Sequence, residues 1–395
     1  MSAKAGGIPR YRPFEGPALL RQGFRPFFLG AGLWALAAML LWIATLHGYL
    51  AIPTAFDPVA WHVHEMLFGF VVATIAGFLL TAIPNWTGRM PLQGLPLAGL
   101  GAVWLAGRLA VLASAWIGAV PAAALDLAFL ALLLGVVLRE VLAGRNWRNL
   151  PMPVALGGLL AANALTHADA AGIAATGPFG QRLAIGIVIL LISLVGGRII
   201  PSFTLNWLKK RGEARLPATF DALDRLALAL VAGALVVWAV APDHGMTGAV
   251  LVAAGLAALV RLARWRAPLT VSEPLVWSLH LGFVWVPLGL LLTGLAALLP
   301  GVPQVAGLHA LTAGAMGGMT LAVMTRATLG HTGRPLTADR WTAAIYLLVA
   351  AAAALRVAAP LALGIYLPLI WASGLAWSAA FGLFAVRYGR LLLAR

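Results

Sequence analysis

Long, unbroken apolar runs are the feature of this sequence that most constrains its fold. They are about 18–25 residues long, the length that a helix needs to cross a bilayer. In lipid every backbone N–H and C=O needs an internal partner, so only helices and closed barrels span it. The strict alternation of polar and apolar residues that a barrel requires is not seen. We predict an all-α integral membrane protein of about twelve transmembrane helices, at residues 28–50, 62–84, 94–114, 118–138, 151–168, 181–200, 220–241, 246–263, 274–298, 304–326, 340–359 and 363–386.

Composition leaves no room for a separate soluble domain. Hydrophobic residues make up 62% of the 395-residue chain and charged residues only 10%, whereas soluble domains carry about 25% charged residues. The polar N-terminal stretch has no cleavage-like pattern, so we expect the first helix to stay as an anchor. We divide the chain into a cytoplasmic N-terminal segment (1–27), a membrane domain (28–386) and a cytoplasmic tail (387–395).

The distribution of basic residues predicts the orientation. Of the 27 Lys and Arg, 23 fall on one alternating set of loops and helix ends, and the opposite loops contain none. Cytoplasmic loops carry this excess in membrane proteins, so both termini are predicted to be cytoplasmic. The net charge of +15 is spread over short loops beside the membrane, where it meets anionic lipid. We therefore expect membrane lipid and no nucleic acid as a partner.

Histidine is the main candidate ligand, because the chain has no cysteine and imidazole commonly binds transition metals and haem iron. Two histidines, His280 and His331, lie on the predicted cytoplasmic half. The other six lie near the predicted outer surface: His47, His62, His64, His167, His244 and His309. An interfacial position with no ligand role is the alternative for His47, His167 and His244.

His64 and His309 are predicted to lie at similar depth on the second and tenth helices. On one helix, His62 and His64 point about 200° apart, so only one of them can face a given partner helix. The face of His309 carries Met316 and borders several glycines, which permit close approach. We predict that His64 and His309 bind one haem from opposite sides.

Charged residues within the predicted helices add further candidates. Arg108, Arg182 and Arg356 could bind the two propionates of a haem through forked hydrogen bonds. For Arg108 an internal ion pair with Asp126, at matching depth on the next helix, is the alternative. Glu65 is expected to hydrogen-bond a ligand histidine, to carry protons, or to cap the second helix.

Three helix ends are similar in sequence. The second helix ends IPNWTGR at Arg89, the sixth ends IPSFTLNW at Trp207, and the tenth leads into Thr332, Gly333 and Arg334. A period of four helices, repeated three times, fits twelve spans.

Several motifs resemble the NnrS family of bacterial membrane proteins. They are FRPFF from Phe24, WHVHEMLFGF from Trp61, GFLLTAIPNWTGR from Gly77, GGRIIPSFTLNW from Gly196, and HALTAGAMGGMTLAVMTRATLGHTGRP from His309 to Pro335. They sample the first, second, sixth and tenth helices. The family motifs carry His62, His64, Glu65, His309 and His331.

The resemblance implies a haem- and copper-containing protein of the bacterial cytoplasmic (inner) membrane, associated with nitric oxide metabolism and protection from nitrosative stress. It does not by itself imply an enzyme; the candidate activity is that of an oxidoreductase acting on nitric oxide. We expect haem b on His64 and His309, and copper at His62 with His167 or His244. Catalytic subunits of haem-copper oxidases are a more distant analogy, but a full binuclear centre is not expected, because the sixth helix has no histidine.

Two other functions fit the sequence. Twelve helices are also the plan of many transporters, although ionisable groups here gather at the outer side and do not trace a path. A non-catalytic assembly or sensor protein is the third hypothesis. In that case the basic loop from Arg326 to Arg334 would dock a partner, an electron-donor protein or quinol among the candidates.

Overall fold

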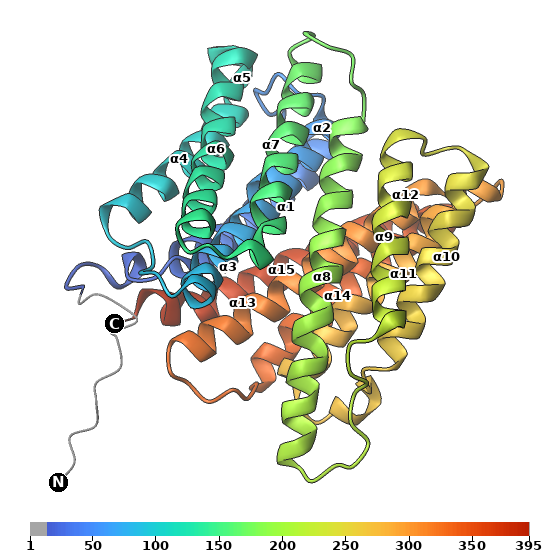
Figure 1. Cartoon of the computed structure of the whole chain (residues 1–395). Coiled ribbons are helices and arrows are strands. Elements are labelled where there is room, and N and C mark those ends of the chain that lie inside the picture. Colours follow the sequence, from blue (N-terminus) through green and yellow to red (C-terminus); the bar gives the residue numbers. More distant parts are fainter. Residues whose placement is uncertain (1–13, 395) are drawn as a thin grey trace.

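The computed structural model describes residues 14–394, and these residues form helices and no strand (Figure 1). Eleven helices in this range are long and apolar enough to cross a membrane. A twelfth long helix, α7 (Pro151–Ala170), packs between α6 (Ala119–Ala143) and α8 (Phe179–Lys210). It is less apolar because it carries Asn163 and His167. The prediction of an all-α multi-pass membrane protein is confirmed.

The long helices form three consecutive groups of four. In the first group, α1, the segment α2–η2–α3, α4 and α6 follow one another; Figure 1 draws them in blue and teal. The second group is α7 to α10, and the third is α11, α12–η5–α13, α14 and α15. The remaining bounds are α1 Phe24–Leu46, α2 Pro58–His64, η2 Glu65–Val71, α3 Val72–Thr87, α4 Leu95–Leu112, α5 Ser114–Ile117, α9 Ala222–Val240, α10 Gly245–Ala263, α11 Pro274–Leu298, α12 Gln304–His309, η5 Ala310–Met316, α13 Gly317–His331, α14 Arg340–Ala358 and α15 Tyr366–Leu393.

The groups close into a ring. The last helix of each group packs against the first helix of the next: α6 on α7, α10 on α11, and α15 on α1. The second member of each group lies toward the middle, where α13 contacts α3 and η5 contacts α8. This arrangement fits the predicted threefold repeat of four helices.

Two π-helical segments occupy matching places in the repeat. The segment η2 begins directly after His64, and η5 begins directly after His309; each has seven residues. Each is followed by an α-helix, then by a glycine with φ of +70° (Gly88 or Gly333) and an arginine. A π-helical turn changes which way the preceding side chains face and is frequent at functional sites. His64 and His309 are therefore equivalent positions of one repeat.

The helices extend beyond several predicted spans. Helix α1 begins at Phe24 instead of residue 28, α8 continues to Lys210 instead of 200, and α15 continues to Leu393 instead of 386. The last turns of α8 and α15 carry basic residues, which interact favourably with the negative end of the helix dipole. Of the predicted N-terminal segment, residues 1–13 lie outside the described residues.

Arg25 ties the first helix to the last. Its side chain is buried, and its Nη1 donates hydrogen bonds to the carbonyl oxygens of Leu392 at 2.9 Å and Ala394 at 2.6 Å. The last four carbonyls of a helix have no partner within it, so the guanidinium supplies donors that the end of α15 needs. The two ends of the described chain accordingly lie at the same edge of the molecule (Figure 1).

We predict that Arg25→Gln lowers the free energy of unfolding by about 2 kcal/mol, because hydrogen bonds from a charged donor are lost. Thermal unfolding of the purified protein in detergent measures this. The control is Arg21→Gln, which removes the same charge from an exposed position. Equal stability of the two variants would contradict the capping role.

Candidate functional site

A buried polar cluster forms where the first group of helices meets the second. It consists of six side chains from four helical segments, each at most 4% exposed. These are His64 and Glu65 at the junction of α2 and η2, Arg108 on α4, Asp126 on α6, and Asn163 and His167 on α7.

Both ring nitrogens of His64 face oxygen atoms. Nδ1 lies 3.0 Å from Oε1 of Glu65, and Nε2 lies 3.0 Å from Oδ1 of Asn163 and 3.2 Å from Oδ2 of Asp126. A neutral imidazole carries only one N–H. A neutral His64 can therefore donate a hydrogen bond to the oxygens on one side of the ring only.

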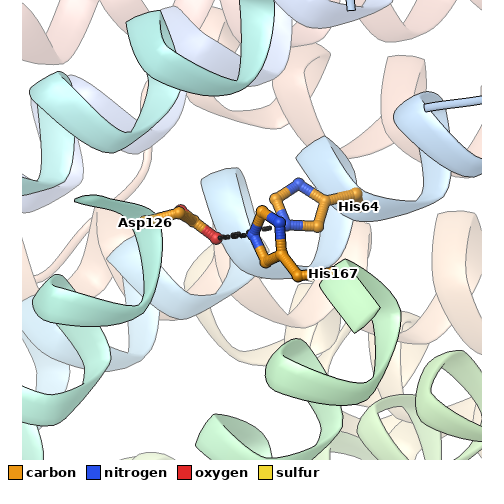
Figure 2. Close-up of side chains that lie close together, drawn as sticks. All are labelled: His64, Asp126 and His167. Carbon is orange, nitrogen blue, oxygen red and sulfur yellow. Dashed lines mark hydrogen bonds and ion pairs between the residues drawn. The ribbon is translucent and has the colours of Figure 1, made fainter. Parts of the chain in front are cut away.

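Asp126 joins the two histidines of the cluster. Its Oδ2 lies 2.9 Å from Nε2 of His167 and accepts a hydrogen bond from the Asn163 amide at 2.8 Å. The rings of His64 and His167 meet edge to face, with centroids 5.0 Å apart. Figure 2 shows both imidazoles turned toward the Asp126 carboxylate. Two nitrogens and one oxygen, all within 4.8 Å of one another, form a possible metal-binding group, and this mixture suits Zn, Cu, Fe or Ni.

The cluster carries an uncompensated negative charge when its histidines are neutral. Arg108 pairs with both Glu65, at 2.9 Å, and Asp126. One guanidinium thus faces two carboxylates. Buried charge is costly unless it is paired, so one more positive charge would complete the cluster: a proton on an imidazole or on one of the two carboxylates, or a bound metal ion.

The π-helical segment positions Glu65. The indole of Trp34 donates to Oε2 of Glu65 at 2.7 Å, and the indole of Trp104 donates to the carbonyl of Gly69 at 3.0 Å. A Cβ at Gly69 would lie 2.6 Å from Nε1 of Trp34 and 2.8 Å from Oε2 of Glu65. Glycine at this place therefore makes room for the hydrogen bond. Capping of α2 belongs to Asp57, whose side chain accepts from Val59 and Ala60.

A large cavity lies on the other side of α2. Its volume is about 590 Å³, and helices of all three groups line it. His62, His309, Arg182 and Arg356 all belong to its wall. Most of the remaining wall is apolar or aromatic, as is usual in cofactor sites of this size; it includes Met39, Trp42, Phe70, Met316, Ile370 and Trp377.

The two histidines of the cavity have nitrogen atoms free to bind a ligand. Nδ1 of His309 donates to the carbonyl oxygen of Val305 at 2.8 Å, which leaves the lone pair on Nε2. His62 stacks on Trp42 with centroids 4.6 Å apart and an interplanar angle of 18°. Within residues 14–394, neither Nδ1 of His62 nor Nη1 of Arg356 has a hydrogen-bond partner.

The structure does not bring His64 and His309 together as predicted. His62 and His64 do diverge on the helix as predicted, but it is His62 that shares the cavity with His309. His64 turns the other way because Asp126 and Asn163 offer it hydrogen-bonding partners.

The other candidates divide between the two sites. Arg182 and Arg356 line the cavity, whereas Arg108 forms the predicted ion pair with Asp126. His167 joins His64 and not His62. His244 joins neither site: it is exposed at the start of α10, where its Nδ1 accepts from the backbone of Met246 at 3.2 Å.

Sequence reasoning missed Asn163 and treated Asp126 only as an ion-pair partner. A signal was present, because a polar residue within a membrane span marks a functional site by default. Asn163 lies four residues before His167, one helical turn away on the same face. That spacing could have placed both on the surface of α7 that faces α6.

We predict that Arg108→Gln lowers the free energy of unfolding by about 3–5 kcal/mol, because two buried carboxylates lose their cation. Asp126→Asn should cost less, since it leaves one carboxylate opposite one guanidinium. Thermal unfolding in detergent compares the two. Arg89→Gln is the control, because it breaks the partly exposed pair with Glu140, worth about 0–1 kcal/mol. A larger loss for Asp126→Asn than for Arg108→Gln would contradict this charge balance.

Comparison with known proteins agrees with the motifs. No curated protein matches the chain. The family model described as NnrS protein matches residues 18–395, which includes every residue of the polar cluster and of the cavity wall. The chain therefore belongs to the NnrS family.

Proposed function

We propose that this protein binds haem in the cavity between α2 and α12–η5, and that it binds or reduces nitric oxide or protects the cell against nitrosative stress. The observation that carries the proposal is the meeting of His62 and His309 with two arginines in one cavity. The family association adds nitric oxide as the ligand. A bacterial cytoplasmic membrane is the proposed location.

The residues of the cavity fit a haem. Nε2 of His309 has its lone pair free, and the bond from Nδ1 to Val305 fixes the ring, as is usual for metal-binding histidines. His62 would be the second ligand. Arg182 and Arg356 would bind the propionates, and the unpartnered Nη1 of Arg356 has a donor to offer a carboxylate. The apolar wall would pack on the macrocycle.

Bound haem would supply a one-electron redox couple, and its ligation decides how it is used. Two histidine ligands suit electron transfer, whereas a coordination position left open suits binding of a diatomic gas. His309 is fixed by a backbone hydrogen bond, whereas His62 stacks on Trp42 and its Nδ1 has no hydrogen-bond partner within residues 14–394. His62 is thus the ligand that could more easily leave its position.

We further propose that the polar cluster binds one metal ion, for which copper is the candidate implied by the family. The ligand atoms and the charges of the cluster support this proposal. Two imidazoles and a carboxylate face one another, and the cluster lacks one positive charge when the imidazoles are neutral. The metal ion would take the place of a proton between His64, His167 and Asp126. Glu65 would orient His64 through Nδ1.

We predict that His62→Ala and His309→Ala each abolish the Soret absorbance of the purified protein, because each removes a haem ligand. His64→Ala should retain haem. His47→Ala is the control, because His47 stacks on Trp371 and is not part of the cavity wall. Haem per protein, measured by absorbance and by extraction on monodisperse samples, decides the matter. Loss of haem in His64→Ala with retention in His62→Ala would refute this assignment.

We predict that His167→Ala removes the bound copper and leaves the haem content unchanged, because His167 belongs to the polar cluster and is not part of the cavity wall. Elemental analysis of the purified variant measures this. His244→Ala, at an exposed histidine, should keep both cofactors. Copper content unchanged in both His167→Ala and Asp126→Asn would exclude the cluster as the copper site.

A further inference from the structure

A second sizeable cavity lies near the end of the bundle that carries the basic loops. Its volume is about 410 Å³, and residues of α1, α3, α8 and α13 line it. Aromatic side chains form much of the wall, among them Phe28, Phe78, Trp86 and Phe203. Polar groups converge at one part of it, where Arg326 and His331 lie on the last turns of α13. No lining residue is shared with the proposed haem cavity.

Arg326 is held by an aromatic ring. Its guanidinium carbon lies 3.9 Å from the centroid of Phe203. The ion pairs formed within residues 14–394 use other arginines, such as Arg261 with Asp224, so the donors of Arg326 are available to a ligand in the cavity. His331 lies against Phe24, with ring centroids 5.5 Å apart, and offers a nitrogen that can donate or accept a proton.

An apolar space continues from this cavity toward the middle of the membrane. It has a volume of about 100 Å³, and its wall is mostly aliphatic, with one phenylalanine, two methionines and two threonines among the lining residues. Phe78, Ile199 and Val323 line both spaces, so the two adjoin. Val71 lines both this space and the proposed haem cavity.

We propose that these two adjoining spaces bind an isoprenoid quinone or quinol. The flat head group would lie among the aromatic side chains, with one oxygen accepting from Arg326 and the other facing His331. The first isoprene units would enter the apolar space between α3, α8 and α13. A single narrow apolar space suits the one tail of a quinone better than the two acyl chains of a phospholipid, and aromatic walls suit a ring. Oxidation of the quinol to the quinone would release two protons and supply two electrons, one at a time, to haem bound as proposed above. This step rests on the proposed function, whereas quinone binding does not.

Quinone binding can be tested on the purified full-length protein with decylubiquinone as the probe. Trp86 lies in the cavity wall, so bound quinone should quench tryptophan fluorescence saturably. Arg326→Gln should weaken binding roughly tenfold, the loss expected for one hydrogen bond from a charged donor. Ala327→Phe should block binding by filling the cavity. Arg334→Gln removes the same charge from the exposed loop and should bind like the unaltered protein.

Each result decides the proposal. Saturable quenching that Arg326→Gln and Ala327→Phe both weaken, and Arg334→Gln does not, supports it. No saturable quenching in the unaltered protein overturns it, as does equal binding by Arg326→Gln and Arg334→Gln. Binding of dioleoylphosphatidylglycerol that depends on Arg326, without binding of decylubiquinone, assigns the cavity to phospholipid and also overturns it. Haem content is measured separately, so a haem-free protein that binds quinone would refute the proposed function and leave this site standing.

Discussion

The pairing of one buried arginine with two buried carboxylates is the interaction on which the first half of the structure depends. Arg108 contacts Glu65 and Asp126, and so joins α4 to the start of η2 and to α6. Asp126 then continues the contact to α7, the first helix of the next group. In apolar surroundings, the loss of one partner would leave a buried charge unpaired and so destabilise the fold. The cluster therefore fixes how the first two groups of helices meet.

The two equivalent positions of the repeat lie in different surroundings. His64 and His309 each stand directly before a π-helical segment, yet one faces a polar cluster and the other faces a cavity. The difference lies in the neighbours. Helices α6 and α7 bring Asp126 and Asn163 to His64, whereas the carbonyl of Val305 takes Nδ1 of His309. By the repeat, His64 would be expected to line the cavity as His309 does. Instead, His62 lines it together with His309.

The sequence could predict the membrane class, about twelve helices, the family and the Arg108–Asp126 pair, because apolar length, matched depth and motifs are local properties. It could also predict that His62 and His64 point apart, which follows from helical geometry alone. It could not decide which of them faces the tenth helix. That choice depends on polar groups from α6 and α7. No local sequence pattern fixes how each of these two helices is rotated about its axis. The π-helical segments, which change the register on both helices, had no signal in the sequence either.

Helix α2 connects the polar cluster to the cavity. It has only seven residues, and His62 and His64 lie on it with one residue between them and their side chains in different sites. Helix α2 continues directly into η2 and α3, so one continuous backbone carries both His62 and His64. The ring of His309, in contrast, is hydrogen-bonded to its own helix through the carbonyl of Val305. The two cavity histidines therefore differ in their surroundings: His309 is held by its own backbone, whereas His62 shares its short helix with a residue of the polar cluster.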